Sequence, residues 1–218
     1  MIFSPMNEAN LIKLQTNQLI SGMQQLELAV EPASTIMAYL MLLQKWNKAY
    51  NLTAINTLPD MVTHHALDAL SVVKYYQGKR IIDVGTGGGI PGFILAIMFP
   101  EKQLVLLDAV GKKARFMRQV KRELGIDNVT VVHERVENYL PDEKFDVVTS
   151  RAFSEISLFL DLTAHLVKPD GRFLAMKGPK EEQLKSGQPF RQTAVWDIQV
   201  PFLSGVRKLY QFEKIQSS

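Results

Sequence analysis

The chain has 218 residues, of which 46% are hydrophobic, and a formal net charge of +3 at pH 7. This length and composition suit one α/β domain with an appendage, and the mildly basic charge is compatible with an RNA partner without requiring one. The absence of cysteine excludes disulfides, zinc–thiolate sites, cysteine-bound iron–sulfur clusters and a cysteine nucleophile.

Two further features narrow the class of protein. The four histidines show no metal-ligand spacing, so no metal site is expected. No apolar run approaches the roughly 20 residues of a membrane span, and the first residues lack the basic and apolar regions of a secretion signal. We therefore expect a cytoplasmic protein that does not cross a membrane.

Three helices are predicted before the first strand, because apolar residues recur at helical spacing over residues 1–30, 32–50 and 57–73. Thr57 and Asp60 resemble a capping box at the start of the third helix. That helix carries three side chains that could take part in catalysis: His64, His65 and Asp68. Capping and hydrogen bonding between helices is the favoured interpretation of these three residues.

From Gly78 onward, strand and helix patterns alternate, which predicts a mostly parallel sheet with helices on both faces. The strands are expected at 80–84, 103–108, 128–133, 145–150, 172–176, 194–200 and 206–212. The helices are expected at 93–99, 112–124 and 155–167, with a turn over 168–171 and a short polar helix over 180–185. The last two strands are expected to form an antiparallel pair at the sheet edge. The chain is thus divided into an N-terminal helical extension, residues 1–77, and an α/β domain, residues 78–218.

The most informative stretch joins the first strand to the following helix. Asp83 stands near the end of the strand and is followed by alternating glycines at positions Gly85, Gly87 and Gly89. Glycines permit positive φ and the close approach of a ligand, and the helix start offers free N–H groups. The stretch therefore predicts a nucleotide-type cradle, with a tight turn that holds no ligand as the plain alternative.

Two cofactors use such a cradle. Gly87, Gly89 and Gly92 match the G-x-G-x-x-G spacing of dinucleotide sites, although this match is weak by itself. The register Asp83-x-Gly85-x-Gly87-x-Gly89 is more similar to the first motif of Rossmann-like methyltransferases, in which the strand-end acid lies near the cationic part of S-adenosylmethionine. S-adenosylmethionine is therefore the favoured cofactor.

Ligands of open α/β sheets bind at the carboxyl ends of the strands, so these ends supply further candidates. Asp108 ends the second strand, where it can accept hydrogen bonds from ribose hydroxyls or cap the next helix. After the third strand, a backbone N–H near Val136 and the carboxylate of Glu137 are candidates to contact adenine, with a solvated loop as the alternative. After the fourth strand, Arg151 suits a carboxylate, a phosphate or a guanine edge, or else a structural ion pair.

Basic residues form a stripe on the helix after the second strand: Lys112, Arg115, Arg118 and Arg122. Lys177 follows the fifth strand near the same edge of the sheet. Together these residues are candidates to bind RNA phosphates. A solvated amphipathic helix has the same pattern, so both interpretations stay open.

Five segments together resemble the RsmG (GidB) family of bacterial methyltransferases: Trp46-Asn-x-x-Tyr-Asn-Leu-Thr53, Asp83-Val-Gly-Thr-Gly-Gly-Gly-Ile-Pro-Gly92, Leu107-Asp-Ala-x-Gly-Lys-Lys113, Ser150-Arg-Ala-Phe153 and Met176-Lys-Gly178. The resemblance covers residues 35–180. It implies a Rossmann-like class I S-adenosylmethionine-dependent methyltransferase fold with a seven-stranded sheet, and methylation of nitrogen 7 of one guanine in the decoding-region loop of 16S rRNA. Carried over by position, it places cofactor contacts on Gly85, Ile90, Val136, Glu137 and Arg151.

One segment departs from the family pattern. Where the family often has Arg-His-x-x-Asp-Ser in the third helix, this chain has His64-His-Ala-Leu-Asp-Ala69. Any role of that arginine and serine is therefore missing here, whereas the residues of the implied cofactor site are all present.

The implied reaction needs no general base, because nitrogen 7 of guanine already has an in-plane lone pair. Positioning can then supply most of the catalysis. Arg151 is the residue assigned to catalysis, and it is expected to act through the cofactor, a phosphate or the guanine oxygen, since the product guanine is itself cationic. The expected partner is 16S rRNA or the small ribosomal subunit, bound by a monomer. A small-molecule methyltransferase, a non-enzymatic ribosome-binding factor and a dehydrogenase are the alternatives.

Overall fold

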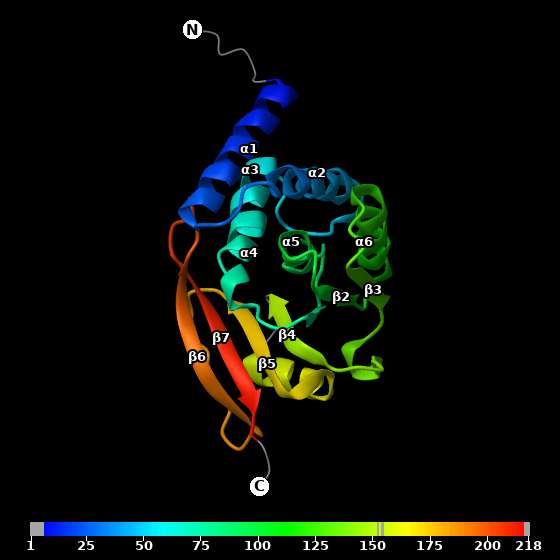
Figure 1. Ribbon diagram of the computed structural model, residues 1–218, viewed down its shortest axis with the longest axis vertical. Coiled ribbons are helices and arrows are strands. Elements are labelled where there is room, and N and C mark those ends of the chain that lie inside the picture. The colour runs from blue at the N-terminus through cyan, green and yellow to red at the C-terminus, as the bar shows by residue number, and fades with distance from the viewer. Residues whose placement is uncertain (1–6, 152, 154, 216–218) are drawn as a thin grey trace.

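The computed structural model describes residues 7–151, 153 and 155–215 of the chain (Figure 1). A seven-stranded sheet runs in the order β3-β2-β1-β4-β5-β7-β6. Its strands are β1 (Arg80–Val84), β2 (Gln103–Asp108), β3 (Val129–His133), β4 (Phe145–Arg151), β5 (Val167–Lys177), β6 (Phe190–Gln199) and β7 (Val206–Lys214). The first five strands are parallel, and β7 lies antiparallel between β5 and β6. The predicted fold class and the antiparallel edge pair are confirmed.

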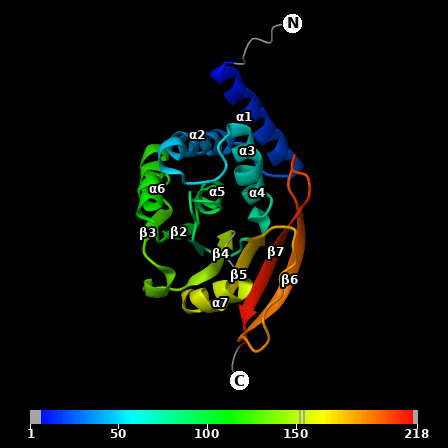
Figure 2. The same ribbon diagram turned by 180° about the vertical axis from the view of Figure 1, so that it is seen from behind.

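Helices cover both faces of this sheet, as Figures 1 and 2 show from opposite sides. The α-helices are α1 (Glu8–Gln25), α2 (Ala33–Tyr50), α3 (Leu58–Met61), α4 (Asp68–Leu70), α5 (Gly92–Met98), α6 (Gly111–Leu124) and α7 (Ile156–Thr163). A π-helical segment, Val62–Leu67, joins α3 to α4, and short 3₁₀ turns cover Val73–Tyr75, Val136–Asn138 and Ala164–Leu166. None of the helices in the described part of the chain is both long enough and apolar enough to cross a membrane.

The alternation of side chains along the strands separates two hydrophobic clusters. Ile81 and Val147 belong to the cluster that contains the buried faces of α2, α5 and α6. Ile82 and Val148 point to the other face and pack in the cluster that contains Phe159 of α7. Strands buried on both faces explain why the predicted strands are continuous apolar runs.

The helices before β1 share the first cluster with the sheet. Leu19 of α1, Leu40 of α2 and Leu67 of the π-helical segment are fully buried in it. Gly22 lies in the last turn of α1, where a Cβ would overlap the side chain of Leu67, so the helices approach closely here. Residues before β1 therefore contribute to the same core as the sheet, and the division at residues 77 and 78 stays a prediction.

Three local predictions differ from the structure. The first helix, expected within residues 1–30 after a short leader, ends earlier than predicted, at Gln25. Asn7 caps its start by accepting a hydrogen bond from the Asn10 amide at 2.8 Å, and residues 1–6 lie outside the described part. The turn predicted over residues 168–171 lies within β5, where pairing with β4 shifts from Phe145–Val167 to Val147–Arg172. Both differences concern the ends of elements, which sequence patterns define poorly.

The short helix predicted over residues 180–185 is wrong, because this segment has no regular secondary structure. Its backbone donors bind side chains of other elements instead. The Glu182 amide donates to the hydroxyl of Tyr210 in β7 at 3.1 Å, and the Lys185 amide donates to the hydroxyl of Ser157 in α7 at 3.1 Å. Long-range contacts thus replace the local hydrogen bonds that a helix would make.

Candidate functional site

The loop between β1 and α5 has the backbone that its glycines predict. Gly85, Gly87 and Gly89 have φ values of +66°, +64° and +95°, a region that other residues adopt at a cost. At Gly89 an added Cβ would also overlap the ring of Phe93, whereas at Gly87 it would meet nothing within 4 Å. Gly89 is therefore required for both its backbone and its packing, and Gly87 for its backbone alone.

Asp83 lies beneath this loop and is fully buried. One carboxylate oxygen, Oδ2, accepts hydrogen bonds from the Thr86 hydroxyl at 2.5 Å and from the Gly92 amide at 2.9 Å. The other oxygen, Oδ1, has no partner among the described residues. Burial raises the pKa of Asp83 to about 7, against the lowering effect of these hydrogen bonds and of the Arg151 charge. Asp83 thus shapes the loop and keeps one polar atom for a further contact.

Asp108, at the end of β2, connects the glycine loop to the start of α6. It accepts a hydrogen bond from the Gly87 amide through Oδ2 and one from the Val110 amide through Oδ1, both at 2.9 Å. Lys113 lies 3.5 Å from the same carboxylate. The helix-start role that was one of the two sequence alternatives is therefore present, and each oxygen keeps a second lone pair for another donor.

A pocket of about 150 Å³ opens beside this loop at the carboxyl ends of the strands. Four residues predicted to bind the cofactor line it: Gly85, Asp108, Val136 and Glu137. Val136 begins a 3₁₀ turn, so its amide makes no bond within that turn. The other five predicted cofactor residues do not line this pocket: Asp83, Gly87, Gly89 and Ile90 lie around the loop, and Arg151 lines a neighbouring pocket. Ile90 is buried in the first hydrophobic cluster.

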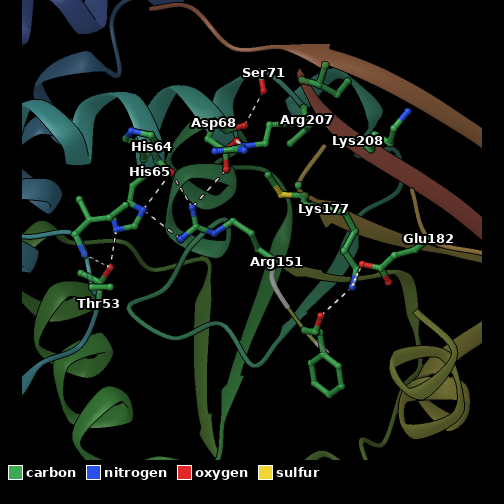
Figure 3. A pocket seen from close by; sticks show the side chains of 17 residues that line it. Thr53, His64, His65, Asp68, Ser71, Arg151, Lys177, Glu182, Arg207 and Lys208 are labelled. Atoms are coloured by element: carbon green, nitrogen blue, oxygen red, sulfur yellow. Dashed lines mark hydrogen bonds and ion pairs between the residues drawn. The ribbon is translucent and has the colours of Figure 1, made fainter. Parts of the chain in front are cut away.

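A larger pocket of about 510 Å³ adjoins the first, and Phe153 contributes to both. Figure 3 shows its lining, which comes from the segment after α2, the π-helical segment with α4, the ends of β4 and β5, and the hairpin of β6 and β7. Among the side chains that line it are four cations: Arg151, Lys177, Arg207 and Lys208. The pocket is therefore open and basic, and it lies beside the smaller one.

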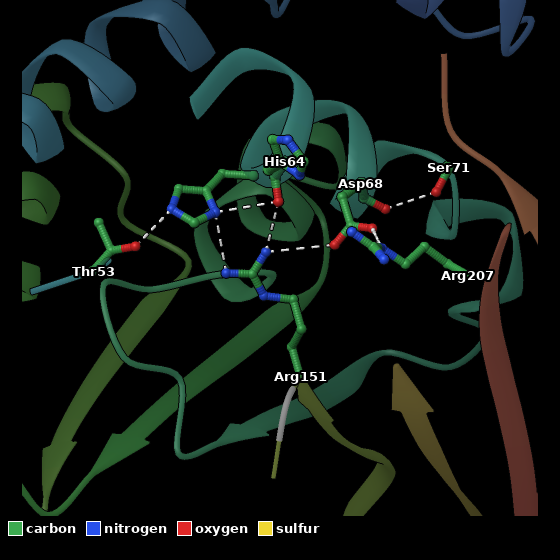
Figure 4. Close-up of polar contacts among 7 residues, drawn as sticks. Thr53, His64, Asp68, Ser71, Arg151 and Arg207 are labelled. Carbon is green, nitrogen blue, oxygen red and sulfur yellow. Dashed lines mark hydrogen bonds and ion pairs between the residues drawn. The ribbon is translucent and has the colours of Figure 1, made fainter. Parts of the chain in front are cut away.

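Arg151 crosses the floor of the larger pocket and binds the π-helical segment (Figure 4). Its Nη1 donates to the carbonyl oxygen of His64 at 2.9 Å and lies 3.4 Å from Oδ2 of Asp68. Its Nη2 lies 3.2 Å from Nδ1 of His65. Both terminal nitrogens of Arg151 are thus engaged with the protein, and the ion-pair alternative from the sequence is present. Contact with the cofactor or the guanine stays a prediction.

The same network includes His65. Nδ1 of His65 lies 3.2 Å from both Nη2 of Arg151, which only donates, and the carbonyl oxygen of His64, which only accepts, and Nε2 lies 3.0 Å from the Thr53 hydroxyl. Either neutral tautomer therefore has a partner on both ring nitrogens. Burial, and then the Arg151 charge, lower the pKa of His65 to about 3. His65 is therefore a neutral hydrogen-bonding residue, in agreement with the structural interpretation favoured from the sequence.

Asp68 is buried and pairs with two arginines from different strands. Its Oδ2 faces Arg151 of β4, and its Oδ1 lies 3.4 Å from Nε of Arg207 of β7. Burial raises the pKa of Asp68 above its ordinary value, and the two guanidinium groups oppose this effect. One carboxylate of α4 thereby connects two strands that are separated by β5 in the sheet.

The residues predicted to bind RNA lie in two places. The basic stripe of α6 is on its outer face, with Arg115, Arg118 and Arg122 exposed and Lys112 half-buried. Lys177 is instead buried in the larger pocket, where Nζ donates to the Phe153 carbonyl at 2.9 Å and lies 3.0 Å from Glu182. The structure thus separates Lys177 from the α6 stripe.

Sequence reasoning missed Arg207 and Lys208, which lie at the start of β7. The signal was available, because an antiparallel strand next to β5 begins where β5 ends, at the edge that carries the ligand sites. It also missed Tyr39 of α2, whose buried hydroxyl donates to the Gly88 carbonyl at 2.9 Å and so joins the N-terminal helices to the glycine loop. Among the described residues, no group of three or more His, Asp or Glu side chains could hold a metal ion.

Comparison with known proteins identifies the family of the chain. A family model described as rRNA small subunit methyltransferase G (GidB) matches residues 33–210. The chain is 49% identical over 187 residues to the ribosomal RNA small subunit methyltransferase G of Hydrogenovibrio crunogenus, a match that covers 85% of this chain and 87% of that protein. It is 47% identical over 194 residues to the corresponding protein of Methylobacillus flagellatus, with 88% and 95% covered.

Solved structures agree at the level of the fold. A SAM dependent methyltransferase from Aquifex aeolicus has a TM-score of 0.54 at 22% identity, over 71% of this chain and 93% of that one. A mitomycin 7-O-methyltransferase has a TM-score of 0.56 at 14% identity, over 84% and 72%. The family match and the sequence identities decide the assignment: the chain belongs to the GidB family of small-subunit ribosomal RNA methyltransferases and is an enzyme that uses S-adenosylmethionine.

Proposed function

We propose that the two adjoining pockets bind the two substrates of the reaction. The adenosine part of S-adenosylmethionine binds in the smaller pocket, and the target guanosine binds in the larger one. Membership of the family makes nitrogen 7 of a guanine in 16S rRNA the atom that is methylated. The guanine in the decoding-region loop is the proposed target. The observation that carries this division is the position of Phe153, which lines both pockets.

The residues around the smaller pocket fit the cofactor. The positive φ values of the glycine loop let its backbone lie close to a ligand, and Asp83 keeps one buried oxygen without a partner beneath that loop. In this proposal Asp108 accepts from the ribose hydroxyls, and Val136 and Glu137 contact the adenine. S-adenosylmethionine supplies an electrophilic methyl group on a positively charged sulfur.

The chain's own residues then position the guanine and exclude competing chemistry. The bond from sulfur to the methyl carbon breaks as the bond from that carbon to nitrogen 7 forms, so no proton has to be removed. This matches a site in which His65 is neutral and already hydrogen-bonded on both ring nitrogens. Arg151 is proposed to act by fixing the wall of the guanine pocket, and through its free Nε toward the cofactor, a phosphate or the guanine oxygen.

The remaining assignments are proposals of the same kind. The stripe on α6 binds rRNA phosphates outside the pocket, and Lys177 acts inside it. The enzyme works as a monomer in the bacterial cytoplasm, where small subunits are assembled. Residues 1–77 form a helical extension that completes the methyltransferase domain of residues 78–218 and supports its glycine loop.

The test uses S-adenosylmethionine labelled in its methyl group. The protein is incubated with small subunits and with naked 16S rRNA from cells that lack this methylation, and the labelled nucleoside is identified. Label in 7-methylguanosine at the decoding-region loop is the expected result. The RNA that is methylated faster, small subunits or naked 16S rRNA, is then the natural form of the substrate. Label at another site would contradict the target, and cofactor binding without transfer to either RNA would favour a small-molecule methyltransferase.

A further inference from the structure

The start of β7 brings two cations to the edge of the larger pocket. Arg207 pairs with Ile198 in β6, and Lys208 pairs with Lys177 at the end of β5. Because β7 runs antiparallel to β5, its first residues lie at the carboxyl ends of the parallel strands, where ligands of this fold bind. Arg207 lines the pocket, and about a third of its side chain is exposed (33%).

Arg207 is the cation of this pocket whose donors are least used within the described part of the chain. Its closest ion-pair contact runs from Nε to Asp68 at 3.4 Å, and no described group accepts a hydrogen bond from Nη1 or Nη2. By contrast, Arg151 and Lys177 are hydrogen-bonded to the protein, and Lys208 lies 2.8 Å from Asp197 and 3.5 Å from Glu181. Two parallel N–H donors of Arg207 are therefore available to a ligand.

The chemistry of the reaction restricts what this pair of donors can bind. A guanidinium commonly binds guanine through oxygen 6 and nitrogen 7 together. That arrangement would occupy the lone pair of nitrogen 7, which must attack the methyl group. A phosphate presents two oxygens at the same spacing and leaves the base free. A backbone phosphate is thus an acceptor that fits the two parallel N–H donors of Arg207 and leaves nitrogen 7 free to react.

We propose that Arg207 binds a backbone phosphate of the target nucleotide in the larger pocket and thereby holds the guanosine for methyl transfer. This inference rests on the proposed use of the larger pocket for the target guanosine. Asp68 orients the guanidinium through Nε, so less side-chain entropy is lost when the phosphate binds. The same carboxylate also pairs with Arg151, so Asp68 holds both the arginine proposed to bind phosphate and the arginine on the pocket floor.

The test compares Arg207→Ala and Arg207→Lys with a matched control, Arg191→Ala. Arg191 lies in β6 of the same hairpin, pairs with Glu213 at 3.0 Å and is 67% exposed, but it does not line the pocket. Arg207→Ala is expected to raise KM for rRNA roughly tenfold, as loss of a charged hydrogen bond does. The number of ions released on rRNA binding, measured from the salt dependence of the affinity, should fall by about one. Arg207→Lys should lie between, and Arg191→Ala should match the wild type.

A second measurement isolates the phosphate. Guanosine 3′,5′-bisphosphate and guanosine compete against rRNA at constant ionic strength, and the bisphosphate is expected to inhibit the wild type and Arg191→Ala more strongly. Arg207→Ala should lose that difference while its affinity for S-adenosylmethionine and its melting temperature stay near the wild-type values. Equal inhibition by both compounds in the wild type would overturn the assignment, as would an unchanged difference in Arg207→Ala.

Failure of this inference is distinguishable from failure of the proposed function. If the wild type forms 7-methylguanosine but Arg207→Ala keeps its KM for rRNA and its salt dependence, only the phosphate contact is refuted. If the wild type forms no 7-methylguanosine, the proposed function itself fails. If Arg207→Ala is unstable, Arg207→Lys retains the charge beside Asp68, and a bisphosphate preference that is weaker than in the wild type and in Arg191→Ala then supports the assignment, whereas an unchanged preference overturns it.

Discussion

Substitution of Tyr39 by Phe tests whether the N-terminal helices support the glycine loop between β1 and α5. The Tyr39 hydroxyl is buried, and burial raises its pKa, so it stays protonated and donates to the Gly88 carbonyl at 2.9 Å. Removing the hydroxyl leaves that buried carbonyl without its donor. The expected cost is about 1–2 kcal/mol in the free energy of unfolding, which corresponds to a melting temperature lower by about 2–8 °C for a chain of this size.

The matched control is Tyr76→Phe. Tyr76 is also buried, and its hydroxyl donates to Thr149 of β4 at 2.8 Å rather than to a residue of the glycine loop. We expect both variants to lose similar stability in thermal denaturation. In calorimetric titration with S-adenosylmethionine, only Tyr39→Phe should bind more weakly, by about threefold to tenfold if part of the lost energy had ordered the loop. Equal affinities in the two variants would refute the argument that α2 orders the cofactor site.

Three further predictions concern separate parts of the site. Gly89→Ala should abolish stable folding or S-adenosylmethionine binding, because its Cβ overlaps a neighbouring ring at positive φ, whereas Gly87→Ala should cost only about 1–2 kcal/mol in urea denaturation. His65 has a native pKa of about 3, below its unfolded value, so the stability it contributes is complete above pH 6.5 and is lost as pH falls toward 3. The free energy of unfolding of His65→Gln should therefore fall less steeply than that of the wild type over this range, and parallel curves would contradict the shift. Combined Arg115→Glu and Arg118→Glu should weaken rRNA binding and lower its salt dependence by about two ions without changing cofactor affinity; an unchanged salt dependence would leave the α6 stripe as a solvated surface.

The parts of the fold that the sequence predicts well are those in which local and global preferences agree. The run from Arg80 to Met98 combines a β-branched strand, glycines at positive φ and an apolar helix, and each of these features is present in the structure. Asn51 and Gly125 end their helices in the left-handed conformation, with φ values of +48° and +62°. Such features depend on residues that are neighbours in the sequence, so a local sequence pattern predicts them.

The parts that the sequence could not predict depend on contacts between distant residues. Arg151, Asp68 and Arg207 meet only because β4, α4 and β7 converge at one edge of the sheet. Residues 180–185 have a polar helical pattern, yet their amides bind Ser157 and other side chains far along the chain. No local window contains both partners of these contacts, and tertiary contacts therefore override the local preference.

The proposed reaction uses no general base, and this places a requirement on the larger pocket, where the guanine is proposed to bind. Nitrogen 7 of guanine is a nucleophile only while its lone pair is free, so a hydrogen-bond donor directed at it would oppose the reaction. The terminal nitrogens of Arg151 contact the His64 carbonyl, Asp68 and His65, and Nζ of Lys177 donates to the Phe153 carbonyl. His65 in turn is neutral, because burial and the Arg151 charge lower its pKa to about 3. If the target guanosine binds in this pocket as proposed, these buried acceptors keep Arg151 and Lys177 away from the attacking nitrogen, which accounts for the ion pairs that both cations make inside the pocket.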